Sequence, residues 1–368
     1  MAEADVYEKL REKISLWPIK VPGTREAMEM LRTLFTEEEA EFLTHFTAPY
    51  QDPETIDQIV ERTGKLREKV QAIVDRLVSR GLLFRFTSKR DGNVYYSLMP
   101  MVPGIFEFYF SSGRDSDEKR KVSELFEKYY MSGGGMEIGA SKYPWARVMP
   151  IEKTITLDKE ISAEHKILPF EKMSEYITTS RRIAVMNCAC RTHLKCDHPL
   201  ETCLVFDYFA EFMVDRGYGR YLSVEDALEL LEEMEKAGLV HSTTNVQTRP
   251  QFICNCCTCA CGILRGLSEL HNPRAFAKSN FLPVKDDELC NPKCKRCVRI
   301  CPMEANLYHA PHDNEPERIL FLEERCIGCG LCAYHCPQDA IKLVKVKDEV
   351  PEMTPREAMM RVEAERVH

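Results

Sequence analysis

The sequence that decides the fold of the C-terminal region reads Cys290-Asn-Pro-Lys-Cys294-Lys-Arg-Cys297-Val-Arg-Ile-Cys301-Pro302 and then, after a spacer, Cys326-Ile-Gly-Cys329-Gly-Leu-Cys332-Ala-Tyr-His-Cys336-Pro337. Each run ends in a Cys-Pro pair, and the residues that follow also correspond, since Pro302-Met-Glu-Ala matches Pro337-Gln-Asp-Ala. Eight cysteines therefore occur in two near-copies of one pattern. Clustered thiolates are soft metal ligands, so the duplicated pattern predicts two metal centres.

This double pattern resembles the bacterial ferredoxins that hold two [4Fe–4S] clusters. The resemblance covers residues 284–346 and implies a ferredoxin-like domain in which the last cysteine of each run crosses over to the other cluster. It implies two ligand sets, which we call the first set and the second set. The first set is Cys290, Cys294, Cys297 and Cys336. The second set is Cys326, Cys329, Cys332 and Cys301.

The first copy departs from the family spacing once, because three residues instead of two separate Cys290 from Cys294. Its C-x3-C-x2-C run is also the signature of radical S-adenosylmethionine enzymes. We exclude that family because Cys301-Pro302 completes a ferredoxin run and a matching second run follows. Segments 319–322 and 340–346 are predicted to be strands of one small sheet. Four cations surround the first copy and form either solvated surface or a docking patch for an acidic redox partner. They are Lys293, Lys295, Arg296 and Arg299.

A second cysteine-rich region, over residues 181–275, contains the nine remaining cysteines of the chain. They are Cys188, Cys190, Cys196, Cys203, Cys254, Cys256, Cys257, Cys259 and Cys261. A lone buried cysteine is usually core packing, but five cysteines within eight residues predict a metal site. Neither group has the paired C-x2-C spacing of zinc ribbons, so one or two further iron–sulfur clusters are favoured over zinc. Nine exceeds by one what two four-ligand sites need, so one cysteine can be free or structural. His193 and His198 are either surface residues or unusual ligands.

Each of these cysteine groups begins where a predicted strand ends, over 182–186 for the first group and 251–253 for the second. We therefore expect the two groups to lie side by side at one edge of a sheet. Helices are predicted over 204–214, 224–237 and 262–270, and the N-terminal amides of the last one would stabilise thiolates or an anionic cluster. The region is interpreted as an α/β cysteine-rich domain.

The N-terminal region begins with a helical stretch in which Thr36 and Glu39 form a predicted capping box. Over residues 30–100, a helix, a turn, a second helix and a hairpin with Asp91-Gly92 in its turn resemble a winged helix-turn-helix domain. Residues 54–90 carry nine lysines and arginines against five acids. Arg67, Lys69, Gln71, Lys89 and Arg90 are candidate DNA contacts. Acids on the same helix would repel phosphate, so a protein-docking module is the alternative.

The fold class predicted from the whole sequence is α+β and multidomain. The predicted parts are 1–100 (winged helix), 101–180 (linker and helical connector), 181–275 (cysteine-rich domain), 284–346 (dicluster domain) and 347–368 (charged tail). The 368 residues carry a net charge of −8, which gives no general affinity for nucleic acid. The first residues are charged and lack the apolar core of a signal peptide, and no apolar run is long enough to span a membrane. A cytoplasmic protein of an anaerobic or well-reduced cell is expected.

Two functions are compatible with these features. The first is an iron–sulfur electron-transfer protein, acting as a redox subunit or partner of an anaerobic oxidoreductase, with the N-terminal module as a docking domain. The alternative is an iron–sulfur redox-responsive transcriptional regulator that binds DNA. The sequence has no P-loop and no HExxH motif. We identify no acid–base or nucleophilic constellation apart from the cysteines, so no catalytic residue is assigned.

Overall fold

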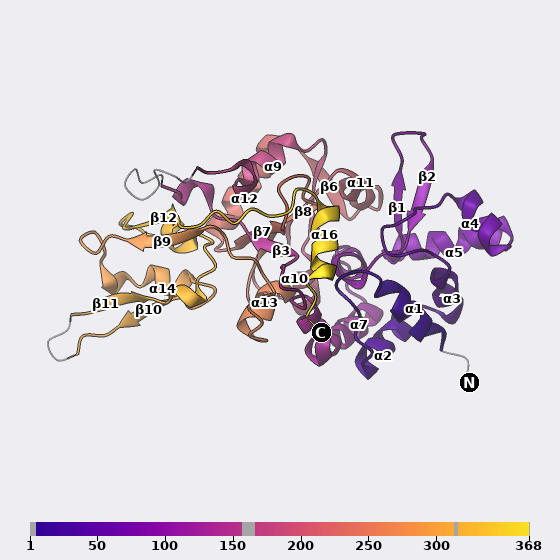
Figure 1. Ribbon diagram of the computed structural model, residues 1–368, viewed down its shortest axis with the longest axis horizontal. Helices are drawn as coiled ribbons and strands as arrows, with labels where there is room; N and C mark the ends of the chain where they lie inside the picture. Colours follow the sequence, from indigo (N-terminus) through magenta and orange to yellow (C-terminus); the bar gives the residue numbers. More distant parts are fainter. Residues whose placement is uncertain (1–4, 157–165, 313–315, 368) are drawn as a thin grey trace.

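The computed structural model describes residues 5–156, 166–312 and 316–367. The parts of the predicted domains that fall on 1–4, 157–165, 313–315 and 368 lie outside the described residues. Three regions follow one another along the longest axis of the molecule (Figure 1): N-terminal helices at one end, a larger sheet with its helices in the middle, and the cysteine repeat at the other end. The protein is therefore a mixed helix and sheet, multidomain chain, as the sequence predicts.

The N-terminal region consists of five helices and one hairpin. Their bounds are α1 (Val6–Ile14), α2 (Arg25–Leu34), α3 (Glu37–Thr44), α4 (Ile56–Thr63), α5 (Arg67–Arg80), β1 (Phe84–Thr87) and β2 (Val94–Ser97). The predicted capping box at the start of α3 is confirmed, because the amides of Thr36 and Glu39 each donate to the other's side chain. Helix α5 ends at Gly81, whose φ of 78° is left-handed. This order of elements agrees with the winged-helix assignment, which itself stays a prediction.

Residues 101–180 contact both neighbouring regions. They contain α6 (Phe106–Phe110), α7 (Asp117–Tyr129), α8 (Gly135–Glu137), β3 (Ala146–Val148), the short 3-10 turns η3 (Glu152–Thr154) and η4 (Pro169–Glu171), and α9 (Met173–Thr179). The aromatic residues of α6 are buried in one apolar core together with the N-terminal helices and with Cys188 and Cys203. Strand β3 pairs with β7 (Val240–Thr244), so this connector also supplies an edge strand of the middle sheet.

The middle region is built on a six-stranded sheet with the order β3-β7-β8-β5-β4-β6. Its other elements are β4 (Ile183–Asn187), α10 (Ala189–Leu194), β5 (Glu201–Phe206), α11 (Asp207–Asp215), β6 (Gly219–Leu222), α12 (Val224–Lys236), β8 (Phe252–Cys256) and α13 (Gly262–Ser268). The helix predicted over 204–214 is wrong at its start, because residues 204–206 belong to β5 and the helix begins at Asp207. Leu204, Val205 and Phe206 are all buried in the interior of the sheet. A short apolar run of this kind fits a buried strand as well as a helix.

The C-terminal region shows the sequence repeat as structure. Its elements are β9 (Phe281–Lys285), η5 (Pro292–Cys294), α14 (Arg296–Ile300), β10 (Asn306–His309), β11 (Arg318–Phe321), η6 (Glu323–Arg325), α15 (Leu331–Tyr334) and β12 (Ile341–Lys345). The prediction that 319–322 and 340–346 share one sheet is wrong, since β11 pairs with β10 and β12 pairs with β9. Sequence reasoning missed β9 because it contains Pro283, and proline is rare inside strands. The first cysteine run thus lies between β9 and β10, and the second lies between β11 and β12.

The segment predicted as a charged tail packs back onto the rest of the chain. It forms α16 (Pro355–Ala364), which lies across the middle of the molecule (Figure 1). Ala358 and Val362 on this helix are buried, and Arg366 donates to the carbonyl of Pro18 at 2.8 Å. The C-terminal segment therefore contacts the N-terminal region at Pro18.

Among the described residues, no helix has both the length and the apolar character needed to cross a lipid bilayer.

Candidate metal centres

The two C-terminal cysteine runs fold so that the last cysteine of each lies among the first three of the other. Burial raises the pKa of Cys290, and the nearby thiols of Cys336 and Cys294 raise it further. Burial, together with the charge of Cys301 from the other run, raises the pKa of Cys329 to about 12. The structure therefore brings each of the two sets together in the crossed arrangement that the resemblance implies.

Backbone amides donate to ligand sulfurs at equivalent places in the two copies. The amide of Ala305 lies 3.2 Å from Cys301 Sγ, and the amide of Ala340 lies 3.3 Å from Cys336 Sγ. These alanines occupy matching positions in the sequence repeat. An N–H donor stabilises negative charge on a cluster-ligating sulfur and tunes its potential. The residues present at both centres therefore fit a pair of [4Fe–4S] clusters.

The strand order of the middle sheet brings the other cysteines together. Strands β4 and β8 are both antiparallel to β5, so they run in the same direction and end at the same edge of the sheet. Cys188 follows β4 directly, Cys203 lies on β5, and Cys256 is the last residue of β8. The expected placement of the two cysteine groups at one sheet edge is confirmed.

Six of the nine middle thiols form a closed circle, in which each lies next to the thiols of its two neighbours. We call it the six-thiol ring. Its members, in order around the circle, are Cys188, Cys190, Cys261, Cys256, Cys254 and Cys203. All six line one cavity of about 140 Å³. The remaining lining is mainly apolar and aromatic, and includes Phe106, Trp145 and Phe252.

Two positions of the ring favour thiolates. Hydrogen bonds from Cys190 and Cys203 lower the pKa of Cys188 well below its ordinary value. Hydrogen bonds from Cys254 and Cys261 lower the pKa of Cys256 to about 6. Cys188 and Cys256 occupy opposite positions in the ring, and the thiolate is the form of cysteine that binds metal. Sulfur-only donors around an apolar cavity fit an iron–sulfur cluster better than a hydrated ion.

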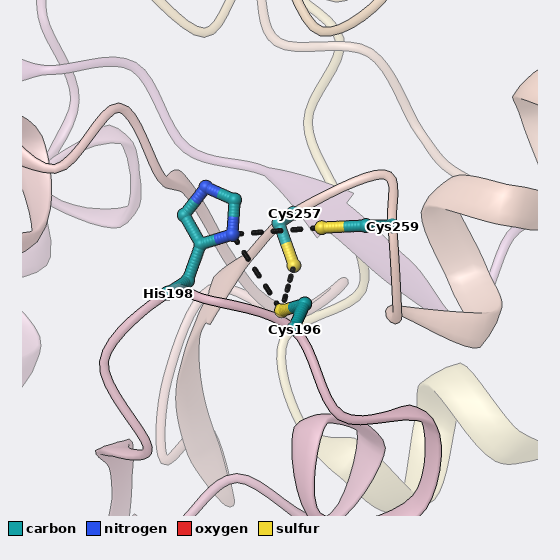
Figure 2. A group of neighbouring side chains, drawn as sticks. All are labelled: Cys196, His198, Cys257 and Cys259. Atoms are coloured by element: carbon teal, nitrogen blue, oxygen red, sulfur yellow. Dashed lines mark hydrogen bonds between the residues drawn. The ribbon is translucent and has the colours of Figure 1, made fainter.

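The three other middle thiols gather around His198, and we call Cys196, His198, Cys257 and Cys259 the tetrad (Figure 2). Cys196 Sγ lies 3.7 Å from Cys257 Sγ and 3.5 Å from His198 Nδ1. Cys259 Sγ also lies 3.5 Å from His198 Nδ1. The six thiols of the ring and the three of the tetrad together account for the positions of all nine middle cysteines. A four-ligand cluster in the ring would use four of its six thiols, so the expectation that a cysteine is free or structural stays a prediction.

His193, the other histidine that the sequence offered as a ligand, borders the ring cavity but packs among aromatic side chains. Its Nδ1 is 2.7 Å from Ser123 Oγ, and its ring packs against the rings of Phe106 and Phe126. Burial lowers the pKa of His193 to about 4, so its imidazole is neutral. His193 is a core residue of the structure.

Arg191 is a functional residue that sequence reasoning missed. It is buried between the ring and the tetrad, and its Nη1 donates to the carbonyl of Asn255 at 2.9 Å and lies 3.8 Å from Cys257 Sγ. Burial alone would lower the pKa of Arg191, yet the thiols of Cys188 and Cys203 hold it above its ordinary value. The available signal was its position directly after Cys190, inside the first cysteine group. Arg191 supplies positive charge between two groups of thiolates.

The C-terminal repeat also matches a known family over residues 289–340, whose model is described as the 4Fe-4S dicluster domain. This segment is a 4Fe-4S dicluster domain. The match covers that part of the chain alone.

Curated relatives share short stretches with the chain. It is 35% identical over 65 residues to the archaeal-type glutamate synthase (NADPH) of Thermotoga maritima, which is 18% of this chain and 12% of that protein. It is 34% identical over 65 residues to NADH-quinone oxidoreductase subunit I of Pelobacter propionicus, covering 16% of this chain and 35% of the relative. It is 34% identical over 68 residues to translation initiation factor rli1 of Schizosaccharomyces pombe, covering 18% of this chain and 12% of the relative. The chain thus spans about a third or less of the length of these relatives. No solved structure matches the chain.

The two cysteine sets of the dicluster domain differ in exposure. In the second set, the three cysteines of the second run are buried, whereas Cys297 is the one fully buried member of the first set. Cys329 of the second set belongs to the same apolar core as Cys256 and Cys261 of the six-thiol ring. The second set therefore faces the middle region, and the first set lies nearer to solvent.

Gly328, in the second cysteine run, lies against the start of β9. Its φ is 71°, and a β-carbon there would overlap Ser279 Oγ and the carbonyl oxygen of Phe281. We expect Gly328→Ala to destabilise the protein by about 3 kcal/mol, from overpacking and left-handed strain together. The measurement is the thermal unfolding midpoint and the iron retained per chain, both under anaerobic conditions.

Gly92 in the hairpin turn gives the matched control, because its φ is 74° and nothing lies within 4 Å of an added β-carbon. Gly92→Ala should lower the free energy of unfolding by about 1 kcal/mol, from the strain of an alanine in a left-handed conformation alone. Equal losses in the two variants would contradict the close approach at Gly328.

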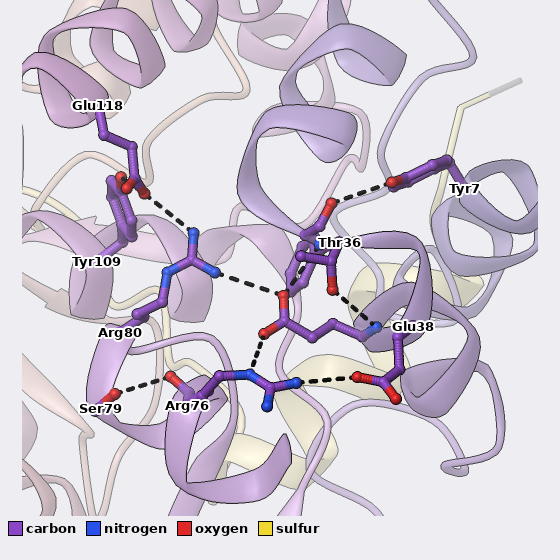
Figure 3. Close-up of polar contacts among 10 residues, drawn as sticks. Tyr7, Thr36, Glu38, Arg76, Ser79, Arg80, Tyr109 and Glu118 are labelled. Atoms are coloured by element: carbon purple, nitrogen blue, oxygen red, sulfur yellow. Dashed lines mark hydrogen bonds and ion pairs between the residues drawn. The ribbon is translucent and has the colours of Figure 1, made fainter. Parts of the chain in front are cut away.

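The cations that the sequence offered as DNA contacts mostly pair with acids of the same chain. Seven of the nine in residues 54–90 form ion pairs: Arg62, Arg67, Lys69, Arg76, Arg80, Arg85 and Lys89. Figure 3 shows Arg76 reaching Glu38 and Arg80 reaching Glu118. The hairpin packs on α11, where the rings of Phe84 and Phe212 lie 4.9 Å apart. The N-terminal region is thus docked on the middle region through its hairpin.

Proposed function

We propose that this chain is an iron–sulfur electron-transfer protein that acts as a subunit or partner of an oxidoreductase. One observation carries the proposal: the dicluster domain packs, through Cys329 of its more buried cysteine set, in a core that also contains Cys256 and Cys261 of the six-thiol ring. Iron–sulfur clusters exchange single electrons, and the protein sets their potentials through hydrogen bonds and burial. The crossed cysteine sets of the dicluster domain are proposed as the ligands of two [4Fe–4S] clusters.

The surface beside the more exposed first cysteine set is positively charged, as a docking surface for an acidic partner would be. Lys295 Nζ lies 3.6 Å from the ring centroid of Tyr308, and Arg299 donates to the carbonyl of Cys294 at 2.9 Å. These contacts hold two cations at the rim of the first set. Arg296 is exposed, and the Lys293 side chain is 75% exposed although it reaches Glu317 at 3.4 Å. The patch therefore suits an acidic redox partner, because complementary charge steers encounter.

Neutralising the patch tests this docking surface. The double variant Lys293→Gln/Arg296→Gln should be reduced by an acidic low-potential ferredoxin about 10-fold more slowly at low ionic strength, because steering by charge is lost. The difference should disappear at high salt, where charges are screened. Lys342→Gln, which removes a cation elsewhere on the domain, is the control. Equal rates for the double variant and the unaltered protein at low salt would contradict the proposed surface.

The six-thiol ring is proposed as the site of one further iron–sulfur cluster, because its six thiols line a single cavity. Chemical analysis of iron and sulfide on anaerobically purified protein, with EPR, tests this assignment. The two cubanes of the dicluster domain account for about eight irons per chain, so the ring cluster requires a higher count. A value of eight would show that the ring holds no iron.

Docking on protein, rather than binding of DNA, is proposed for the N-terminal region. Seven of the nine lysines and arginines in residues 54–90 pair within the chain, among them the candidate contacts Arg67, Lys69 and Lys89, and the hairpin contacts α11. Binding to duplex DNA, measured at low and high salt, tests the alternative of a redox-responsive regulator. DNA binding that is present at low salt and weakens at high salt would favour the regulator. Rapid reduction by a low-potential donor and reoxidation by an acceptor, without DNA binding, would favour the electron-transfer protein.

A further inference from the structure

We infer that the tetrad of Cys196, His198, Cys257 and Cys259 is a separate site for a single zinc ion. A tetrahedral zinc with Zn–S bonds of about 2.3 Å and a Zn–N bond of about 2.0–2.1 Å places two sulfurs about 3.8 Å apart and a sulfur and a nitrogen about 3.5 Å apart. In the tetrad the Cys196 and Cys257 sulfurs are 3.7 Å apart. His198 Nδ1 lies 3.5 Å from the sulfurs of both Cys196 and Cys259. The spacing is that of four ligands around one ion.

A cubane does not fit between these four ligand atoms. Its irons and sulfides occupy the centre of the ligand set and hold the four ligands at the corners of a larger body. All four tetrad atoms lie within 4.8 Å of one another, which leaves room for one ion. The six thiols of the ring, by contrast, line a cavity of about 140 Å³, which Cys257 also borders. The nine middle cysteines thus divide into two sites of different chemistry.

The donor set selects the metal. Three thiolates and one imidazole are a common ligand set of structural zinc, in which four protein ligands close the coordination sphere. Zinc also binds nitrogen and sulfur donors more tightly than ferrous iron does in the usual order of affinities. Preference for iron over zinc in this region, which the sequence suggested, therefore applies to the ring and not to the tetrad.

Charge around the tetrad fits a bound zinc ion. Three thiols lose their protons on binding, so Zn²⁺ with three thiolates and a neutral imidazole has a net charge of −1. Arg191 Nη1 lies 3.8 Å from Cys257 Sγ, and it is a buried cation placed to balance that charge. Cys257 is buried and Cys259 is exposed, so the site lies at the edge of the middle region.

The tetrad joins the two loops that also carry the ring cysteines. Cys196 and His198 lie in the loop between α10 and β5, and Cys257 and Cys259 lie in the turn between β8 and α13. Ring cysteines flank the tetrad ligands on both loops. A metal bound at the tetrad fixes the distance between the loops, and so supports the ring without itself carrying electrons. This role does not depend on the electron-transfer function.

The first test uses the unaltered full-length chain, purified anaerobically. Metal analysis should find one zinc per chain beside the iron. Zinc-edge X-ray absorption should show three sulfurs at about 2.3 Å and one nitrogen at about 2.0–2.1 Å. Absence of zinc, or a single iron at this ligand set, would overturn the inference.

Two substitutions of one residue provide the second test. His198→Ala should weaken zinc retention against a chelator by more than about 100-fold. Loss of a residue that only hydrogen-bonds to a metal ligand lowers metal affinity by about 10–100-fold, and loss of the ligand itself should lower it further. His198→Cys keeps four ligands and should retain zinc, which separates ligation from a general folding defect. The eight irons of the dicluster domain should remain in both. Loss of iron with zinc unchanged in His198→Ala would assign the tetrad to a cluster instead.

Discussion

Cys254→Ser is expected to remove the iron of the six-thiol ring while leaving the dicluster domain and the zinc intact. Cys254 lies on β8, and its thiol lies between those of Cys203 and Cys256 in the ring. A serine hydroxyl is a hard donor and a poor ligand for a site that otherwise offers thiolates alone. We expect iron per chain to fall by about four or more, to the eight of the dicluster domain. Iron, sulfide and zinc analysis with EPR measures the change.

Cys259→Ser is the matched control for this experiment. Both variants exchange one sulfur for oxygen, but Cys259 belongs to the tetrad and is exposed. It should lose zinc and keep the iron of both the ring and the dicluster domain, the reverse of Cys254→Ser. If Cys254→Ser keeps its full iron, or if both variants lose the same metal, the division of the middle cysteines is incorrect.

Lys345→Met is expected to destabilise the protein by about 3–5 kcal/mol, because it leaves a buried carboxylate without its cation. Lys345 on β12 of the dicluster domain pairs with Glu171 of η4 at 2.9 Å, and both side chains are 1% exposed. Glu171 also accepts from the side-chain amide of Asn280 at 2.7 Å. The pair thus joins the dicluster domain to the connector. The measurement is the denaturant midpoint under anaerobic conditions.

Two companions make this prediction specific. Lys342, also on β12, pairs with Asp339 just before the strand, and these two side chains are 43% and 77% exposed. Lys342→Met should therefore lower the free energy of unfolding by less than about 1 kcal/mol. The double variant Lys345→Met/Glu171→Leu removes both buried charges and should recover most of the stability. A loss for Lys345→Met no larger than that for Lys342→Met would mean that the buried pair does not hold the domains together.

The sequence predicted the dicluster domain well because its ligands are set by short spacings that repeat. Each cysteine run carries three ligands within eight residues, and the fourth comes from an equivalent position in the other run. The strand partners were harder to predict, since β9 contains Pro283 and β10 begins with the buried Asn306. Neither segment has the alternation that marks a strand.

The division of the middle cysteines could not be read from spacing. Cys256 and Cys257 are adjacent in the sequence, yet one belongs to the ring and the other to the tetrad. Neighbouring residues at the end of a strand point to opposite sides, so the partners of each depend on which strands lie beside β8. That order is a property of the folded sheet. The pairing of the N-terminal cations is similar, because Arg85 and Lys89 find their acids on α11, more than a hundred residues away.

The covered position of the six-thiol ring sets an order for the maturation of the protein. Phe106, Tyr130 and Trp145 line the same cavity as the ring, and all three come from the connector, which packs over the cysteines of the sheet edge. A protein core is packed too densely for a cofactor to pass through it. Delivery to the ring must therefore precede the closing of the connector over the sheet. The tetrad has an exposed cysteine, so its ion can be loaded or stripped after folding is complete.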